Sequence, residues 1–423
     1  MKAVEGAEAT NGKRLHLRVS QSAETAVRSG HPWVFADSVR ECSRRGKTGE
    51  IGVVYDREDR FLAVGLFDAE SPIRLRVLER GRRCRVDGEF WAKRMDRAVE
   101  ARRGVVGEET DGYRVVHGES DGWPGLVVDR FGEVLVVKIY TAAWMPWLGA
   151  VQNELVRVLH PSAIVLRMGR HCSEAVREQG IVSSTLEGGS KGVSACDGSV
   201  LYGSLEQSTV LFRESGLVFE SDVVRGQKTG FFLDQRENRR KVEALAAGQV
   251  MINTFSYSGG FSVYAARGGA RRIVDVDVSA LALESGRRNF ERNVPSEGWA
   301  CVRDGLKADV FEWLREAPPG GCGLIVVDPP SMAKRETERV EAIRQYGRLA
   351  SGAIRQLREK GGMLVAASCS SHVSSVEFFN AVLGACRAST RRFSEIERTG
   401  HPADHPCGFA EAAYLKCIYV RFG

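Results

Sequence analysis

Short runs in which apolar and polar residues alternate fill the chain from Arg14 to Arg85. Examples are IGVVYD, FLAVGLF and IRLRVL, which are separated from one another by Gly, Asp and Glu-Asp breaks. A period of two is typical of half-buried strands, and the breaks favour turns between them. The pattern predicts a small β-rich barrel or sandwich within residues 1–85.

A mixed pattern follows over residues 86–215. Between Phe90 and Val105 the apolar residues recur near helical spacing, which predicts a helix. Strand-like runs then alternate with DGWPG and RFGE turns, and we expect a helix around Trp144 to Leu159 before the strand SAIVLRM. We interpret this region as a central α+β domain that contains no catalytic constellation.

The pattern changes again in the third region, residues 216–423. Beyond Gly248, the apolar runs VMINTFS, RRIVDVD, ACVRDG, CGLIVVDPP and GGMLVAASCS alternate with amphipathic segments. Apolar strands that alternate with helices predict a parallel, doubly wound α/β sheet. We expect the helices at 280–293, 309–316, 338–357 and 376–386. The segments STRRFSEIERT and YLKCIYVRF would add an antiparallel edge and complete a seven-stranded, Rossmann-like sheet.

Length and hydropathy agree with this division. A chain of 423 residues exceeds one ordinary core, so two or three domains are expected. No run of about 18 apolar residues without charge occurs, and the first residues lack the apolar stretch of a secretion signal. We expect a soluble, cytoplasmic protein with no membrane association.

The cysteines indicate reduced thiols. They are scattered along the chain and form no CxxC pair, so a zinc site or a disulfide framework is disfavoured. His405 and Cys407 offer two metal ligands without partners, and we predict no metal. The ten positions are Cys42, Cys84, Cys172, Cys196, Cys301, Cys322, Cys369, Cys386, Cys407 and Cys417.

Positive charge is concentrated near the N-terminus. Residues 1–103 hold 22 Lys and Arg against 16 Asp and Glu, which accounts for the whole formal charge of +6. Alternation along the strand IRLRVLER places Arg74 and Arg76 on one face, and Arg80, Arg82, Arg83 and Arg85 follow. A rim that tracks the phosphates of a polyanion is one interpretation. A solvated, charge-guarded edge strand is the other, and composition does not choose between them.

Ligands of a doubly wound sheet bind at the C-terminal ends of its strands. After the first strand comes NTFSYSGGF, which contains Phe255, Tyr257 and Gly259. Adjacent glycines let the backbone approach a ligand closely and expose amides near a helix start. The loop is not GxGxxG, so a dinucleotide is disfavoured, although a plain turn would use the same residues.

Carboxylates stand at the ends of the next strands. Asp275 and Asp277 share a side of the second strand, and Asp277 lies nearer its tip, where it could accept both hydroxyls of a ribose. Asp309 could hold the amino group of an adenine. Helix N-capping is the structural alternative, by Ser279 or Asp277 after the second strand and by Asp309 at the later helix.

The fourth strand runs into Asp328-Pro329-Pro330-Ser331. Two prolines after a buried strand remove two amide donors and stiffen the chain against a flat substrate. The fifth strand ends at Ser368-Cys369-Ser370, at the same edge. Cys369 is either a core residue or a nucleophile, and its place at the strand tip favours the nucleophile.

A cysteine nucleophile there has a specific use. Carbon 5 of a pyrimidine becomes nucleophilic only when a thiolate has added to carbon 6. The thiol must be partly ionised, and the amide dipoles of the following helix start could promote this.

The motif set resembles the ribosomal RNA large subunit methyltransferase I family. The resemblance rests on QKTGFFLDQRENR, NTFSYSGGFSVYAA, VDVDVS, ADVFEWL, VVDPPS and SCS, and on GHPWVF, YRVVHGESDGWPGLVVDR, ADHP and YLK. It implies a PUA RNA-binding domain, a class I methyltransferase domain, the cofactor S-adenosylmethionine and the product 5-methylcytosine in 23S rRNA. It also implies Gln235 and Arg236 beside the cofactor, Asp277 on its ribose, Asp328 near the methyl donor, and Cys369 as nucleophile.

Two positions depart from that family's pattern. Ser331 and Met332 stand where Lys-Phe is usual, and no partner cysteine accompanies Cys369 in the motif. The base that removes the C5 proton is therefore open between Asp328 and a water, and Cys407 is a rival nucleophile. Purine N-methylation without covalent catalysis and a non-catalytic, ribosome-assembly RNA-binding protein are the alternative functions. A homodimer is also compatible with the sequence.

Overall fold

A computed structural model describes residues 14–181, 195–295 and 300–423. The chain divides into two compact units. The first unit comprises Met1–Val210 and Ser221–Gly230, and the second comprises Leu211–Glu220 and Phe231–Gly423. The three-part boundaries at 85/86 and 215/216 remain a prediction.

The first unit begins with a six-stranded sheet of order β2-β6-β5-β4-β1-β3. Leucines and valines that alternate along these strands form its core, together with α1 (Gln21–Arg28). The strands are β1 (Leu15–Val19), β2 (Trp33–Phe35), β3 (Val39–Cys42), β4 (Ile51–Tyr55), β5 (Phe61–Phe67) and β6 (Ile73–Arg80). The period-two pattern therefore predicted a β-rich fold correctly.

Arg76 corrects the expected cationic face. β6 is an interior strand that pairs with β2 and β5, so it is not a guarded edge. The Arg76 side chain is buried, and its Nη1 donates to the Ile73 carbonyl at 3.2 Å. The exposed arginines are those at and beyond the strand end: Arg80, Arg82, Arg83 and Arg85.

A five-stranded sheet of order β11-β10-β9-β8-β7 follows in the same unit. Helices α2 (Gly88–Glu100), α3 (Leu148–Leu159) and α4 (Arg170–Gln179) accompany it, and Trp91, Trp123 and Trp144 are buried in its core. The expected helix around Trp144 begins later, at Leu148, because the 3-10 turn Ala142–Trp147 contains Pro146. The strands are β7 (Gly112–His117), β8 (Leu126–Phe131), β9 (Val134–Ile139), β10 (Ala163–Met168) and β11 (Val200–Gly203).

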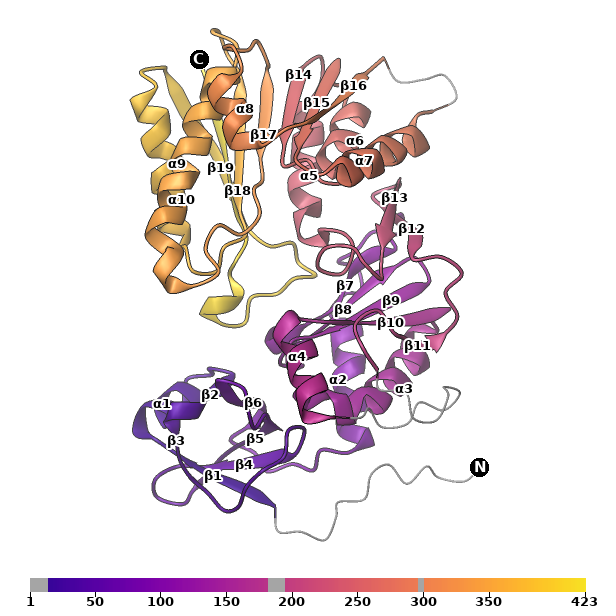
Figure 1. Ribbon diagram of the computed structural model, residues 1–423, viewed down its shortest axis with the longest axis vertical. Helices are drawn as coiled ribbons and strands as arrows, with labels where there is room; N and C mark the ends of the chain where they lie inside the picture. Colours follow the sequence, from indigo (N-terminus) through magenta and orange to yellow (C-terminus); the bar gives the residue numbers. More distant parts are fainter. Residues whose placement is uncertain (1–13, 182–194, 296–299) are drawn as a thin grey trace. The chain divides into compact units, whose positions relative to one another are not determined.

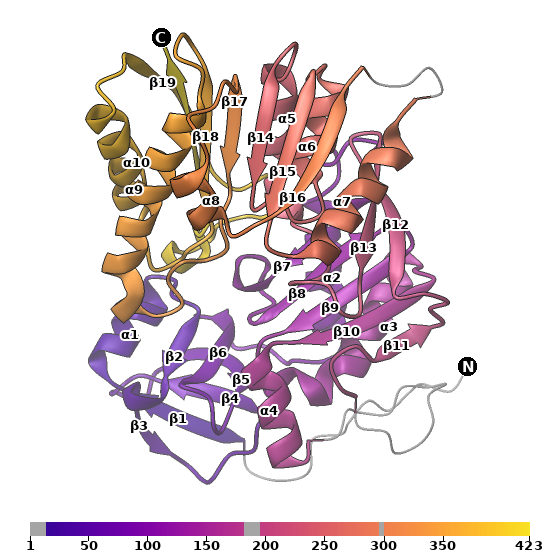
Figure 2. The same cartoon turned by 45° about the horizontal axis from the view of Figure 1, so that its top comes forward.

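The second unit is built on a seven-stranded sheet of order β16-β15-β14-β17-β18-β20-β19. Figure 2 shows β16 and β19 at its two edges. β20 is antiparallel to both β18 and β19, as the sequence predicted. The strands are β14 (Val250–Thr254), β15 (Arg272–Asp277), β16 (Val302–Lys307), β17 (Leu324–Val327), β18 (Met363–Ser368), β19 (Phe393–Thr399) and β20 (Lys416–Phe422).

Helices cover both faces of this sheet because the residues of its strands alternate between two cores. Leu364 and Ala366 pack with α8 (Val310–Glu316), α9 (Arg339–Gln356) and α10 (Ser375–Ala388), which Figure 1 shows together beside β17 and β18. Met363 and Val365 face the other core. That core includes side chains of α5 (Arg236–Leu245), α6 (Gly260–Arg267) and α7 (Ala280–Asn293).

A short hairpin, β12 (Thr209–Glu214) with β13 (Leu217–Asp222), stands at the division between the units. Its Glu214 accepts two hydrogen bonds from Arg239 of α5, at 2.7 and 2.8 Å. Within residues 14–181, 195–295 and 300–423, no helix has the length and apolar character needed to cross a membrane.

Candidate active site

Five parallel strands of the second unit, β14, β15, β16, β17 and β18, end at one edge of the sheet, where doubly wound folds bind ligands. We call this the reactive edge. Because β20 runs antiparallel, its first residue, Lys416, lies opposite Ser368, the last residue of β18. The chain that precedes β20, residues 400–415, therefore also reaches the reactive edge.

The loop after β14 has an unusual backbone. Phe255 and Tyr257 have φ of 54° and 46°, and Gly259 has φ of 73°. A Cβ on Gly259 would lie 3.2 Å from the Cα of Gly286 in α7, so glycine permits both the left-handed turn and this close approach. The Tyr257 amide donates to Asp277 Oδ2 at 2.9 Å, which joins the loop to the end of β15.

Asp275 and Asp277, two residues apart, have opposite surroundings. Asp275 is buried and accepts from Asn253, Ser262 and Arg303, and burial raises its pKa. Asp277 is half-buried, and backbone amides of Tyr257 and Ser279 donate to its two oxygens. Each oxygen of a carboxylate can accept more than one bond, so Asp277 retains acceptor capacity toward a ligand.

Asp309 is the N-cap of α8, which was the alternative to adenine binding. Its Oδ1 accepts from the amides of Phe311 and Glu312 at 2.8 and 3.1 Å. The Phe311 ring contacts Phe255 edge-on, with centroids 6.1 Å apart. Val278, directly after Asp277, is 66% exposed. Apolar surface and carboxylates therefore stand together at the ends of β14 and β15 and at the start of α8.

Ser331 stands where the family usually continues Asp-Pro-Pro with Lys-Phe, and its hydroxyl has a defined set of contacts here. The Ser331 hydroxyl lies 3.1 Å from the Ser370 hydroxyl, which also accepts from the Met332 and Ala333 amides. Tyr346 of α9 contacts Ser370 as well, at 2.9 Å. The hydroxyls therefore tie the Asp328-Pro-Pro loop to the turn after β18.

Cys369 is half-buried at the tip of β18, between Ser368 and Ser370, which are both buried. Its Sγ lies 3.9 Å from the Pro329 carbonyl oxygen, so the thiol and the Asp328-Pro-Pro loop are brought together as the sequence suggested. The half-buried Asp328 immediately precedes Pro329.

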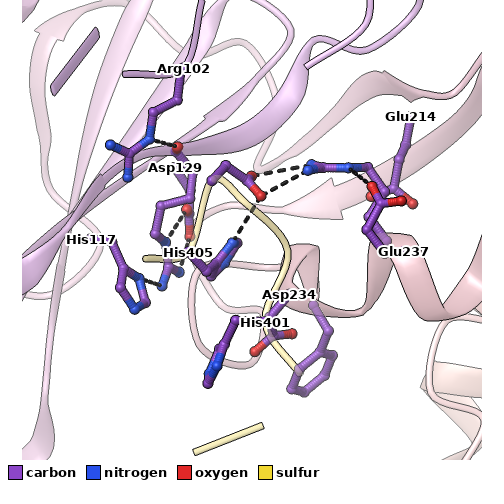
Figure 3. A network of polar contacts seen from close by, with 12 residues as sticks. Arg102, His117, Asp129, Glu214, Asp234, Glu237, His401 and His405 are labelled. Atoms are coloured by element: carbon purple, nitrogen blue, oxygen red, sulfur yellow. Dashed lines mark hydrogen bonds and ion pairs between the residues drawn. The ribbon is translucent and has the colours of Figure 1, made fainter. Parts of the chain in front are cut away.

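Arg236 and Gln235 are buried at the start of α5. The Arg236 guanidinium makes two hydrogen bonds to Asp404, at 2.8 and 3.2 Å. His405, which is labelled in Figure 3, pairs with the same carboxylate. Burial alone would raise the pKa of Asp404, but His405 and Arg236 outweigh it and hold that pKa below its usual range. The Gln235 side chain accepts from Asn238 at 2.6 Å. The Arg236–Asp404 bonds connect α5 to residues 400–415, a link that the sequence did not reveal.

Cys407, the rival nucleophile, is exposed and lies 3.0 Å from His401 Nδ1. His401 Nε2 accepts from the Leu415 amide at 3.1 Å, so the proton of the neutral ring is on Nδ1. In that tautomer His401 cannot take the thiol proton. Although the residue as a whole is exposed, partial desolvation of its sulfur raises the pKa of Cys407.

Lys416 is the site residue that sequence reasoning missed. Its side chain is buried at 3% exposure, and its Nζ donates to the carbonyls of Ser370 and Val373. The expected source of thiolate stabilisation, the next helix start, lies farther along the chain. α10 begins at Ser375, and the Glu377 amide of its first turn is already bonded to Ser374.

All ten cysteines are free thiols. In the part of the chain that the structure describes, no three His, Cys, Asp or Glu side chains cluster as a metal site.

Comparison with known proteins gives two family matches and two similar solved structures. A family model described as S-adenosylmethionine-dependent methyltransferase matches residues 113–421, and a model described as a PUA-like domain matches residues 17–80. A solved chain from Streptococcus mutans has a TM-score of 0.77 at 18% identity, covering 96% of this chain and 99% of that one. Another structure, solved with S-adenosylhomocysteine, has a TM-score of 0.79 at 19% identity and the same coverage. At this identity the two structures support the fold.

Curated relatives align over almost the whole chain. The "Ribosomal RNA large subunit methyltransferase" of Deinococcus radiodurans is 49% identical over 98% of this chain and 99% of its own length. The "Ribosomal RNA large subunit methyltransferase I" of Shewanella frigidimarina is 32% identical over 96% of this chain and 99% of its own.

Proposed function

Because the chain belongs to the S-adenosylmethionine-dependent methyltransferases, and among them to the ribosomal RNA large subunit methyltransferase I family, we propose that it methylates cytosine C5 in large-subunit ribosomal RNA. Cys369 acts as the covalent nucleophile. The observation that carries the proposal is the half-buried Cys369 thiol at the reactive edge, 3.9 Å from the Pro329 carbonyl.

The donors and surfaces at the ends of β14 and β15 suit an adenosyl group. Asp277 is oriented by two backbone amides and keeps acceptor capacity for ribose hydroxyls. Phe255, Phe311 and the exposed Val278 offer apolar surface for adenine. Asp309 has a second carboxylate oxygen beyond the one that caps α8, and in the proposal that oxygen accepts from the adenine amino group.

Gln235, Arg236, Tyr257 and Gly259 complete the proposed cofactor site. Tyr257 and Gly259 shape the loop next to Asp277. Arg236 is engaged with Asp404, so in the proposal it positions the start of α5 while Gln235 lies beside the cofactor.

The chemistry begins with the chain's own thiolate. Cys369 Sγ adds to C6 of the cytosine, and the ring electrons make C5 nucleophilic. Bound S-adenosylmethionine supplies the electrophilic methyl group that C5 accepts. Asp328, or a water that it orients, then removes the C5 proton. The C6–S bond breaks, the aromatic ring is restored, and the Cys369 thiolate is released.

The first unit is proposed to hold the RNA. Residues 17–80 match the PUA-like model, and Arg80, Arg82, Arg83 and Arg85 are exposed at the end of β6 and beyond it. Arginines that contact phosphates provide affinity without reading sequence, so the target base would be selected at the reactive edge after it leaves its stack.

RNA that contains 5-fluorocytosine tests the function. A C5 enzyme cannot remove fluorine, so it remains covalently attached to the RNA. The expected result is an adduct on the peptide that contains Cys369, in the wild type and in C407A, and no adduct in C369A.

Two other results would replace the proposal. A methylated purine without any adduct would indicate N-methylation, and an adduct on Cys407 would make that residue the nucleophile. Failure to bind S-adenosylmethionine in calorimetry would instead indicate an RNA-binding protein without catalysis.

A further inference from the structure

Lys416 places a buried ammonium group directly beneath the turn that follows Cys369. It is the first residue of β20 and lies opposite Ser368, so both side chains project from the same face of the sheet. Nζ donates to the Ser370 and Val373 carbonyls, and the second bond is 2.6 Å long. An ammonium has three N–H donors. Among the residues that the structure describes, only two protein acceptors are found for Lys416 Nζ, so its third N–H is available.

A charge buried to this degree needs a specific electrostatic partner. Carbonyl dipoles alone do not compensate it, since burial lowers the pKa of Lys416 to about 8. The groups that act in the opposite direction are Cys369 and, on α10, Glu377. Glu377 is already bonded to Ser374 and Arg339, which leaves the Cys369 thiolate as the partner at the reactive edge.

Three groups at this end of the sheet, namely Tyr346, Asp328 and the first turn of α10, do not supply positive charge to Cys369. Tyr346 of α9 is neutral, and burial raises its pKa. Asp328 at the end of β17 is acidic and would oppose ionisation of the thiol. The nearby α10 uses its first-turn amide on Ser374.

We propose that Lys416 is a positioning residue for Cys369: it holds the turn of residues 369–373 and stabilises the Cys369 thiolate with its ammonium charge. The inference rests on the proposed function for its catalytic meaning, although the thiol can be examined without RNA. The Cys369 proton goes to solvent, and Lys416 remains protonated while the C6–S bond forms. When that bond breaks, the electron pair returns to sulfur opposite the same ammonium.

The charge state of Lys416 limits its effect on the Cys369 thiol to a pH window. Lys416 carries its charge below about pH 8 and loses it above, so it lowers the pKa of Cys369 only in the lower range. Alkylation of Cys369 should therefore begin at a lower pH than alkylation of Cys407, whose pKa is raised by burial.

The test is the rate of alkylation by iodoacetamide between pH 5.5 and 9.5 on the full chain, measured for individual cysteine peptides by mass spectrometry. In wild type, the pH midpoint of Cys369 should lie below that of Cys407. In K416Q, which keeps a donor but loses the charge, we expect the Cys369 midpoint to rise by about one unit, a roughly tenfold slower rate at pH 7. The conservative K416R should keep the lower midpoint.

Y346F is the matched control, because it removes the hydrogen bonds with Ser368 and Ser370, the two residues that flank Cys369, without changing charge. Its Cys369 midpoint should equal that of wild type. An unchanged midpoint in K416Q, or equal shifts in K416Q and Y346F, would overturn the inference. A wild-type Cys369 midpoint at or above that of Cys407 would do so even if K416Q failed to fold.

Methylation by the same variants separates this inference from the proposed function. If C369A methylates RNA, the nucleophile assignment fails, while the alkylation profile still decides the role of Lys416. If the assignment holds, K416Q should lose kcat with little change in KM, and activity should recover as pH rises toward 9.

Discussion

The two halves of the reactive edge are held in place by different kinds of groups. In the cofactor half, at the ends of β14 and β15, backbone amides of Tyr257 and Ser279 orient the half-buried Asp277 carboxylate. The nucleophile half, at the ends of β17 and β18, relies on side chains: hydroxyls of Ser331, Ser370 and Tyr346 and the Lys416 ammonium.

The difference follows from what each half binds. A neutral diol is recognised by an acceptor whose charge is already stabilised by amide donors. A thiol has to become charged before it reacts, so its surroundings need a cation that favours the ionised form. Substitutions in the nucleophile half should therefore leave the affinity for S-adenosylmethionine unchanged. Substitutions in the cofactor half should leave the reactivity of Cys369 unchanged.

The largest expected effect is that of C369A on methylation. Loss of the nucleophile should lower kcat by at least about a thousandfold, because C5 stays unreactive. Affinity for S-adenosylmethionine, measured by calorimetry, should not change, since Cys369 belongs to the other half. If C369A turned over near the wild-type rate, Cys369 would not be the nucleophile, and the half at β17 and β18 would have no separate role in the chemistry.

Replacing Asp275 by Ala should affect stability strongly. It leaves Arg303 buried without its carboxylate, at a cost of about 3 to 5 kcal/mol in the free energy of unfolding. Urea denaturation measures this. D304A is the matched control on neighbouring β16, because Asp304 pairs with Arg272 at the surface, and it should cost less than about 1 kcal/mol. Equal costs would show that Asp275 is not a structural anchor.

D277N should weaken S-adenosylmethionine binding by about 10- to 30-fold, since a charged acceptor for the ribose hydroxyls is lost. Cys369 alkylation should keep its wild-type pH profile. A variant that binds the cofactor normally would remove Asp277 from the proposed cofactor site.

D309S has the smallest expected effect and separates capping from binding. Serine caps helices about as well as aspartate, so thermal stability should be close to wild type. Affinity for S-adenosylmethionine should fall about fivefold if the carboxylate holds adenine. An unchanged affinity would leave Asp309 as the N-cap of α8 alone.

Local features of this chain were predictable from the sequence. The helix expected at 280–293 is α7, and the tips of β15, β17 and β18 carry Asp277, Asp328 and Cys369 as expected. These features depend on periodicity and on residues close together in the chain, which the pattern records directly.

Long-range partners were not predictable. Lys416 reads as an ordinary strand residue in YLKCIY, and only the β18–β20 register reveals that it faces the turn after Cys369. Arg236 and Asp404 are 168 residues apart, so their pairing left no local signal. Arg76 was misjudged for a related reason: alternation gives the face of a strand, but the neighbours β2 and β5 decide whether that face is covered.

The hydrogen bonds at the reactive edge also have consequences for the order of folding. Tyr257 and Asp277 are 20 residues apart, whereas Lys416 and Ser370 are 46 apart, and they meet only when β20 pairs with β18. Closing the longer loop costs more chain entropy. We therefore expect a refolding chain to form the Tyr257–Asp277 loop first. The Cys369 thiol should become reactive only after β20 has paired with β18 in its native register.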